Sequence, residues 1–473
     1  MQLLISALLV WALPFGFLNA TAQQKKSTLS KSAQETKKVF QDLFQKKTNT
    51  DSIKTVETRY GPTNKSEYVH YTVTPGQMAS NAKLLDVDML LPFNQGTAMI
   101  RKGNATALID TAANFIVPFG KYTFVAGTEK HPNFKKQIVH NGIFQYLAYM
   151  QNPGAFLNSK GKLLATSTSE QLYTYTPNRQ MIYFLKQWRT RQPNGTEVYT
   201  KQYTYMNNEG RKYVFNAEVK QLSEDVFTLT SGHYITIEGK QINKEPFDEV
   251  EPFSNGMALV GKIDAFGQMK YGYINAEGKL VVPLQFTLKP GHFNGGYAKV
   301  FPKNKSDFEY AYINQQGEIV FKQTYAQQQQ YGTFQHFNTF GFAYSGHYVL
   351  NSQLQIMKSQ ELMAAMGLPP TMWPIDSRLE GVEGENDPKL FISGPIGKEG
   401  MFKNISLIGF VNTKSKTVVL PAFYKIDDFD PVSGLAYAEA IIGRDRYGTI
   451  QLQKGYINDR GLFVMVQSKG GTW

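Results

Sequence analysis

Apolar and polar residues alternate along most of the chain after about residue 55, in short runs separated by turns rich in Gly, Asn and Asp. The clearest case is residues 247–283, FDEVEPFSNGMALVGKIDAFGQMKYGYINAEGKLVVP. Alternation with a period of two gives a strand two distinct faces, so this segment is predicted to form β-hairpins. Asn275 followed by Gly278 suits a tight turn closed by a left-handed glycine, and Pro283 is expected to end the return strand because it lacks an N–H.

The same pattern recurs in residues 292–321, where Tyr312, Ile313 and Asn314 match residues 273–275 and Gly317 matches Gly278. Most matched pairs lie 39 or 40 residues apart. Similar closing hairpins occur at Asp110, Asn158, Asn351, Asn412 and Asn458, the last of these followed by Gly461. A single hairpin is marginal in water, so the units must pack on one another. An all-β repeat array with a period of about 39 residues is predicted, and a propeller-like closed ring is favoured over an open solenoid because closure removes exposed strand edges.

The residues of this unit closely resemble those of the WG-repeat family of β-repeat proteins. A unit of that family runs aromatic-acidic-x-apolar, then Phe-x-x-Gly-x-Ala, then Trp or Tyr-Gly-aromatic-Ile-Asp or Asn, then Gly. Residues 247–250, 253–258 and 271–278 follow this order, with Tyr271 and Gly272 in place of the Trp-Gly pair. The resemblance covers roughly residues 85–465, apart from two stretches that fit poorly, and implies an all-β assembly whose biochemical roles are mostly unassigned. Such a fold does not settle function by itself.

The N-terminal region differs from the repeats. Residues 1–22 contain no Asp, Glu, Lys or Arg and end in Ala-Thr-Ala, which is typical of a cleaved signal peptide. An uncleaved membrane anchor is the weaker alternative, because Pro14 interrupts an apolar run that is short for a membrane span. Residues 23–84 are expected to be a polar leader and accessory segment with a short amphipathic helix. The repeat domain would then cover 85–465, with an insertion at 357–387 that begins as a short helix.

The composition limits the cellular compartments and the kinds of chemical site that are expected for this protein. The 473 residues include no cysteine, which excludes disulfides, thiol catalysis and thiolate metal sites. An exported chain of this kind fits a bacterial envelope, either periplasmic or extracellular. The net charge of +12 favours contact with anionic surfaces, although the scattered Lys and Arg residues also fit a simple role in solubility. No nucleic-acid partner and no stable membrane span after signal cleavage are expected.

Motifs for catalysis are missing from the sequence. The seven histidines form no H-E-x-x-H, and no G-x-S-x-G, P-loop or G-x-G-x-x-G occurs, so no catalytic residue, cofactor or metal is predicted. The acidic cluster of Asp427, Asp428 and Asp430 lies in the part of the unit that is also acidic at residues 248–251. It is therefore assigned to the repeat, with its side chains facing solvent.

Two departures from the repeat are the candidate binding surfaces, although tolerated loop length and strand-core packing would also account for them. The first is the Tyr/Arg-rich stretch 165–230, and the second is the insertion. The candidate residues are Tyr173, Tyr175, Tyr183, Trp188, Arg189, Arg191, Met372 and Trp373.

These surfaces point to an exported, non-enzymatic scaffold that binds another protein or an envelope polymer. The alternative is a carbohydrate-active or wall-modifying enzyme whose site is built from loops between repeats. Such an enzyme would need two carboxylates close together. The insertion offers Asp376, Glu380, Glu383 and Glu385.

Overall fold

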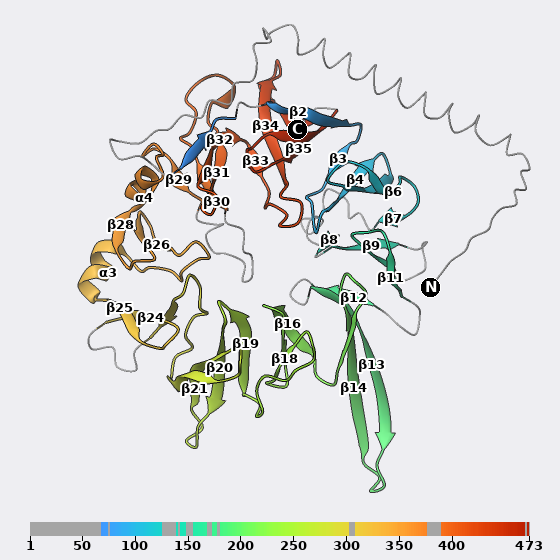
Figure 1. Ribbon diagram of the computed structural model, residues 1–473, viewed down its shortest axis with the longest axis vertical. Coiled ribbons are helices and arrows are strands. Elements are labelled where there is room, and N and C mark those ends of the chain that lie inside the picture. The colour runs from blue at the N-terminus through green and yellow to red at the C-terminus, as the bar shows by residue number, and fades with distance from the viewer. Residues whose placement is uncertain are drawn as a thin grey trace, which may run out of the picture. The chain divides into compact units, whose positions relative to one another are not determined.

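The protein is described by a computed structural model that covers residues 68–73, 76–124, 139–140, 142–147, 155–167, 173–176, 180–301, 308–375, 389–468 and 471–472. The described residues form nine small, mainly antiparallel sheets that follow one another along the chain, the blades of a β-propeller (Figure 1). Two short α-helices, α3 (Tyr325–Tyr331) and α4 (Ser359–Ala365), and the 3-10 helix η3 (Gly400–Phe402) accompany these sheets in that part of the chain.

Blades one to five occupy the first part of the propeller. Blade one holds β3 (Met89–Leu90), β4 (Thr97–Lys102), β5 (Ala105–Asp110) and β6 (Phe115–Val117). Blade two holds β7 (Thr123–Phe124), β8 (Val139–His140), β9 (Ile143–Leu147), β10 (Ala155–Asn158) and β11 (Leu163–Thr166). Blade three holds β12 (Thr174–Thr176), β13 (Met181–Arg191), β14 (Glu197–Met206) and β15 (Lys212–Phe215). Blade four holds β16 (Val219–Ser223), β17 (Val226–Leu229) and β18 (Tyr234–Thr236). Blade five holds β19 (Glu249–Ser254), β20 (Met257–Ile263), β21 (Met269–Asn275) and β22 (Leu280–Phe286). Pro283 lies inside β22, where the pairing with β21 is irregular, so the expectation that it ends this strand is wrong.

Blades six to nine complete the series. Blade six holds β23 (Ala298–Val300), β24 (Tyr310–Ile313) and β25 (Ile319–Gln323). Blade seven holds β26 (Ala343–Ser345), β27 (Tyr348–Leu350) and β28 (Ile356–Lys358). Blade eight holds β29 (Trp373–Pro374), β30 (Lys389–Ser393), β31 (Ile408–Asn412) and β32 (Thr417–Phe423). Blade nine holds β33 (Lys425–Ile426), β34 (Ala436–Arg444), β35 (Ile450–Ile457), β36 (Phe463–Gln467) and β37 (Gly471–Thr472).

The first two strands that the structure describes belong to the last two blades. β1 (Val69–Tyr71) pairs in parallel with β32 of blade eight, and β2 (Met78–Leu85) pairs in parallel with β36 of blade nine. Each covers a strand edge that would otherwise be open to other chains. Residues 69–71 and 78–85 are therefore part of the propeller sheets.

The core is divided into clusters that each join two neighbouring blades. Nine such clusters occur among the described residues, and the last one joins blade nine back to blade one. Pairs that share a cluster are, in blade order, Leu108 and Phe144, Phe156 and Ile182, Tyr205 and Phe227, Tyr234 and Phe253, Tyr273 and Val300, Tyr312 and Leu350, Val349 and Ile392, Phe410 and Ala438, and Tyr456 and Ile100. Apolar packing thus passes from every blade to the next and closes on itself.

The prediction of an all-β, propeller-like array is confirmed. The expected N-terminal helix and the signal peptide lie outside the described residues, as does most of the inserted loop. Helix α4 falls within the stretch for which the sequence predicts a short helix. It buries Leu362 and Met363 against blades seven and eight. None of the helices that the structure describes is long and apolar enough to cross a membrane.

Candidate functional site

The hairpin of β13 and β14 is the feature that departs most from the other blades. Figure 1 shows both strands, in green, extending well past β12. β12 pairs only with Met181–Tyr183 of β13, and β15 pairs only with Tyr203–Met206 of β14. Beyond these residues the two strands continue as a ribbon, and every residue from 185 to 199 is exposed. We call residues 185–201 the arm.

The sequence explains why the arm is a hairpin. Its strands are rich in Tyr, Thr and other β-formers, and they flank Gln192-Pro193-Asn194-Gly195-Thr196. Gly195 has a φ of 84°, and its N–H donates to the carbonyl of Gln192 at 2.9 Å. The Asn194 side chain accepts the N–H of Thr196 at 3.0 Å. Such a turn joins two antiparallel strands without strain.

The register divides the arm into two chemically different faces, because opposite residues of an antiparallel pair lie on the same side. One face brings together Arg189 with Tyr199, Arg191 with Glu197, and Gln187 with Lys201. The other face brings together Trp188 with Thr200, Thr190 with Val198, and Lys186 with Gln202. The first face is cationic, and the second is mainly neutral, with an aromatic ring and β-branched side chains.

Large side chains of the arm are open to solvent. Tyr199 is 69% exposed, and Leu185, Trp188 and Val198 are exposed by 38–39%. Lys186 lies over the Trp188 ring at 5.7 Å, and Arg189 pairs with Glu197 at 2.7 Å. Four cations against one carboxylate leave the arm positively charged. A ribbon of this composition fits contact with an anionic partner that also has apolar groups.

The structure separates the predicted binding residues into three groups. Trp188, Arg189 and Arg191 are on the exposed arm. Tyr173, Tyr175 and Tyr183 lie at its base, where they pack against the blade clusters, and Tyr173 meets Phe184 edge to face at 5.2 Å. Burial raises the pKa of the Tyr173 and Tyr175 hydroxyls. All three tyrosines are half-buried and contribute to the packing of these clusters.

Met372 and Trp373 do not join the arm residues. Met372 packs on the cluster between blades seven and eight, and Trp373 in β29 lies 5.4 Å from the ring of His347. Met372 therefore serves packing. Blades four to seven lie between this position and blade three along the chain, so these residues and the arm are separate features.

Sequence reasoning missed five residues of the arm, and a local signal could have found them. Two long runs rich in Tyr, Thr and other β-formers flank a Pro-Asn-Gly turn, which is a hairpin signature. Extending that hairpin beyond the repeat length exposes both of its faces. The missed residues are Leu185, Lys186, Val198, Tyr199 and Lys201.

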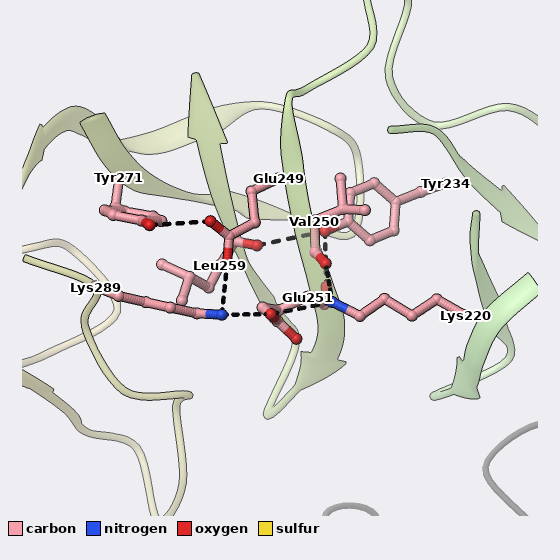
Figure 2. Close-up of polar contacts among 8 residues, drawn as sticks. All are labelled: Lys220, Tyr234, Glu249, Val250, Glu251, Leu259, Tyr271 and Lys289. Atoms are coloured by element: carbon pink, nitrogen blue, oxygen red, sulfur yellow. Dashed lines mark hydrogen bonds and ion pairs between the residues drawn. The ribbon is translucent and has the colours of Figure 1, made fainter. Parts of the chain in front are cut away.

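A second polar cluster joins blades four and five to the segment before blade six (Figure 2). The Lys289 Nζ lies 2.6 Å from a carboxylate oxygen of Glu249 and 2.6 Å from one of Glu251. Lys220 adds an ion pair with Glu251 at 3.0 Å and donates to the carbonyl of Val250 at 2.8 Å. The Tyr271 hydroxyl donates to Glu249 at 2.9 Å.

This arrangement does not favour acid–base catalysis. Partial burial alone would raise the pKa of Glu251, but hydrogen bonds from Lys289 and Lys220 outweigh it and hold that pKa below its usual value. The pKa of Glu249 is lowered in the same way, with Lys289 and Tyr271 as donors. A glycosidase needs one carboxyl group whose pKa is raised so that it can donate a proton. The pair instead forms an ionised network that ties blades together.

The acidic cluster of the last repeat differs from the prediction that it faces solvent. Asp430 is only 5% exposed, and its carboxylate accepts the N–H groups of Gln95 at 2.6 Å and Gly96 at 2.9 Å, in blade one. Asp428 is exposed and Asp427 is half-buried beside Lys425. The correction has a physical reason: a buried carboxylate is stable where several N–H donors surround it, and blade closure supplies them.

Lys299 is a buried cation that the sequence did not reveal as special. It is 7% exposed, and it occupies the place that Leu259 has in the preceding repeat. Its Nζ donates to the carbonyl of Phe334 at 2.7 Å and lies 3.8 Å from the centre of the Tyr310 ring. Burial lowers the pKa of Lys299 to about 8, with Glu309 acting in the opposite direction. The preceding repeat has leucine at this position and the following one has Tyr344, so we expect the buried cation of Lys299 to stabilise the core less than an apolar side chain would.

The remaining candidates for chemistry fall in two groups. Among the residues described by the structure, no set of three His, Cys, Asp or Glu side chains is placed to hold a metal ion. The four carboxylates of the enzyme alternative, Asp376, Glu380, Glu383 and Glu385, lie outside the described residues.

Comparison with known proteins agrees with the repeat. Residues 247–262 and 271–305 match the model of the WG containing repeat, which confirms the resemblance over those residues. No curated protein matches the sequence.

Among solved structures, the chain is similar to an acylaminoacyl peptidase of Pyrococcus horikoshii, at 9% identity and a TM-score of 0.28, over 60% of this chain and 51% of that chain. It is also similar to the WD40 domain of SCAP from fission yeast, at 8% identity and a TM-score of 0.21, over 84% and 88% of the two chains. A third is the BP39L lectin from Burkholderia pseudomallei, at 9% identity and a TM-score of 0.19, over 81% and 99%. The chain spans about half the length of the peptidase. The propeller assignment rests on strand order and packing between blades.

Proposed function

We propose that this protein is an exported β-propeller that acts as a binding scaffold, without catalysis of its own, and that the arm is its contact site for a protein or an envelope polymer. Export rests on the signal-like residues 1–22. The main observation is the arm itself, a ribbon exposed on both faces that displays Trp188, Tyr199 and four cations. Natural proteins usually shorten or cover such strands, so a long exposed ribbon points to a partner.

The test removes the arm without disturbing blade three. Leu185 and Tyr203 are opposite one another in the sheet, so an Asn-Gly turn can join them in place of residues 186–202. Tyr203 and Tyr205, which pack in the blade cluster, are retained. The full protein and the shortened variant are then used to retain material from envelope fractions, with crosslinking.

The full protein is expected to retain a protein or polymer that the shortened variant does not, while both unfold at similar temperatures. Equal retention by the two proteins, or retention of nothing by the full protein, would overturn the proposal.

A further inference from the structure

The outer edge of β13 is a vacant pairing position. Leu185–Arg191 has no strand beside it on the side away from β14, in the portion of the chain that the structure describes. A strand edge of seven residues presents a row of backbone N–H and C=O groups to solvent, which another extended chain can pair with. β14 has a comparable edge, but it bears Glu197, the one carboxylate of the arm.

Two occupants of this edge are disfavoured by the arm itself. A second copy paired through the same edge would bring the cations Lys186, Arg189 and Arg191 of both chains close together, which disfavours the strand pair. Insertion of the tip into a membrane would require apolar residues at the end of the hairpin, and residues 192–196 are Gln-Pro-Asn-Gly-Thr. An extended, acidic segment of another protein meets neither obstacle.

The alternation along β13 specifies the pattern that such a segment would have. Gln187, Arg189 and Arg191 point to one face, and Trp188 and Thr190 point to the other. A strand added at this edge places its own alternate residues beside these two sets. Carboxylates on one face would meet the two arginines, and apolar side chains on the other would pack on Trp188.

Building on the proposed function, we infer that the arm binds an extended partner segment in which acidic and apolar residues alternate, and that this segment adds as a new strand to the outer edge of β13. Main-chain hydrogen bonds would supply affinity, and Trp188, Arg189 and Arg191 would supply selectivity.

The first experiment selects ligands from a displayed library of random peptides of about twelve residues, long enough for one strand. The full-length protein is the bait. We expect enriched peptides with Asp or Glu at every second position. We expect these to bind an Arg189→Glu/Arg191→Glu variant at least about tenfold more weakly. A Lys240→Glu/Lys279→Glu variant, which reverses two exposed cations outside the arm, is expected to bind as the unmodified protein does.

The second experiment tests strand addition. In an enriched peptide, N-methylation of one alternate set of backbone amides removes the donors that face the arm, and methylation of the other set does not. One methylated peptide is expected to lose at least about tenfold in affinity while the other keeps it.

Enriched peptides without acidic alternation would overturn the inference, as would equal binding of the two methylated peptides. Displacement of the peptide by heparin, with tighter binding of heparin than of any peptide, would also overturn it by showing a general polyanion site. If the selected peptides fail to compete with envelope material whose retention depends on the arm, this inference fails while the proposed function stands.

Discussion

At the scale of single residues, the hydrogen bonds and backbone conformations of the closing turns can be predicted directly from the sequence. In blade five the Asn275 side chain accepts the N–H of Lys279 at 2.9 Å, and Gly278 adopts a φ of 79°. Gly317 and Gly461 have φ values of 83° and 73° in the equivalent turns. In such a turn the asparagine oxygen accepts a backbone N–H a few residues later, and a residue in the left-handed region follows. Because all the groups involved are close in sequence, the turn can be predicted from the sequence alone.

The two turns of blade five offer a matched pair of glycine substitutions. A Cβ added at Gly278 would lie 2.5 Å from the carbonyl oxygen of Ile242, whereas one added at Gly267, with a φ of 76°, would meet open space. Gly267→Ala is expected to cost about 1 kcal/mol for its backbone conformation, and Gly278→Ala at least about 2 kcal/mol more because backbone must move. Denaturant unfolding measures both. Equal losses would show that the contact with Ile242 relaxes without cost.

Lys299 leads to a prediction with a pH dependence. Its pKa is about 8 in the folded protein against 10.5 in the unfolded chain, so the unfolded chain holds the proton more strongly. Stability from this residue is therefore lowest below pH 8 and recovers as pH rises towards 10.5. Replacing Lys299 with leucine should stabilise the protein at pH 7 by about 1–2 kcal/mol, after loss of the bond to Phe334.

The same advantage of Lys299→Leu should shrink between pH 8 and 10.5. Chemical denaturation of the unmodified protein and of Lys299→Leu over that pH range measures the difference between their free energies of unfolding. Tyrosines also titrate there, but they are present in both proteins, so their contribution cancels in the difference. Lys299→Met serves as a control of similar length. If both variants are less stable than the unmodified protein at pH 7, the contacts with Phe334 and Tyr310 outweigh the cost of burying the charge.

At the scale of elements, a buried tyrosine in the third strand of several blades bonds to the backbone beyond its own sheet. The hydroxyl of Tyr273 donates to the carbonyl of Gly291 at 2.7 Å, and that of Tyr234 donates to the carbonyl of Glu251 at 2.7 Å. Tyr456 donates to the carbonyl of Leu91 at 2.6 Å and so joins blade nine to blade one. The aromatic position of the repeat therefore fixes neighbouring blades to one another as well as filling the core.

Tyr273→Phe tests this link. The substitution keeps the ring but leaves the buried carbonyl of Gly291 without that donor, which should cost about 1–3 kcal/mol. Tyr297→Phe is the control, because its hydroxyl donates to the carbonyl of Ser352 at an exposed position. We expect the control to lose at most about 0.5 kcal/mol. Thermal unfolding measures the loss of stability of each variant. If Tyr273→Phe loses no more stability than the control, Tyr273 stabilises the protein through its ring and not through its hydroxyl.

The limits of sequence prediction follow the same division between local and distant contacts. Strand alternation and the Asn-to-Gly turns gave the blades, and the Tyr/Arg-rich stretch led to Trp188, Arg189 and Arg191 on the arm. The burial of Asp430 could not be inferred, because its partners Gln95 and Gly96 lie more than 330 residues away. The half-buried position of Tyr183 could not be inferred either, because periodicity does not show which end of a long hairpin lies against the next blade.

At the scale of the whole propeller, closure depends on the ends of the chain meeting. β1 and β2 add to blades eight and nine, Asp430 holds a turn of blade one, and the cluster around Tyr456 is shared by blades nine and one. These contacts differ in kind, but they all act at the same join. Each blade of the closed ring packs against two neighbours, so losing this join affects every blade through its neighbours.

A truncation tests the join directly. A variant that begins at Val87 lacks β1 and β2, and a variant that begins at Tyr68 keeps them. Without the two strands, the outer edges of β32 and β36 are open, and the buried side chains of His70 and Val73 are lost from the interface. The shorter variant should unfold roughly 5–10 °C lower and associate through its open edges. Light scattering after size exclusion detects that association.

Adding a peptide of residues 68–86 should reverse the association in part, because the peptide can pair in parallel with both edges. A monomeric variant from Val87 with an unchanged unfolding temperature would show that the blade clusters close the propeller without these strands.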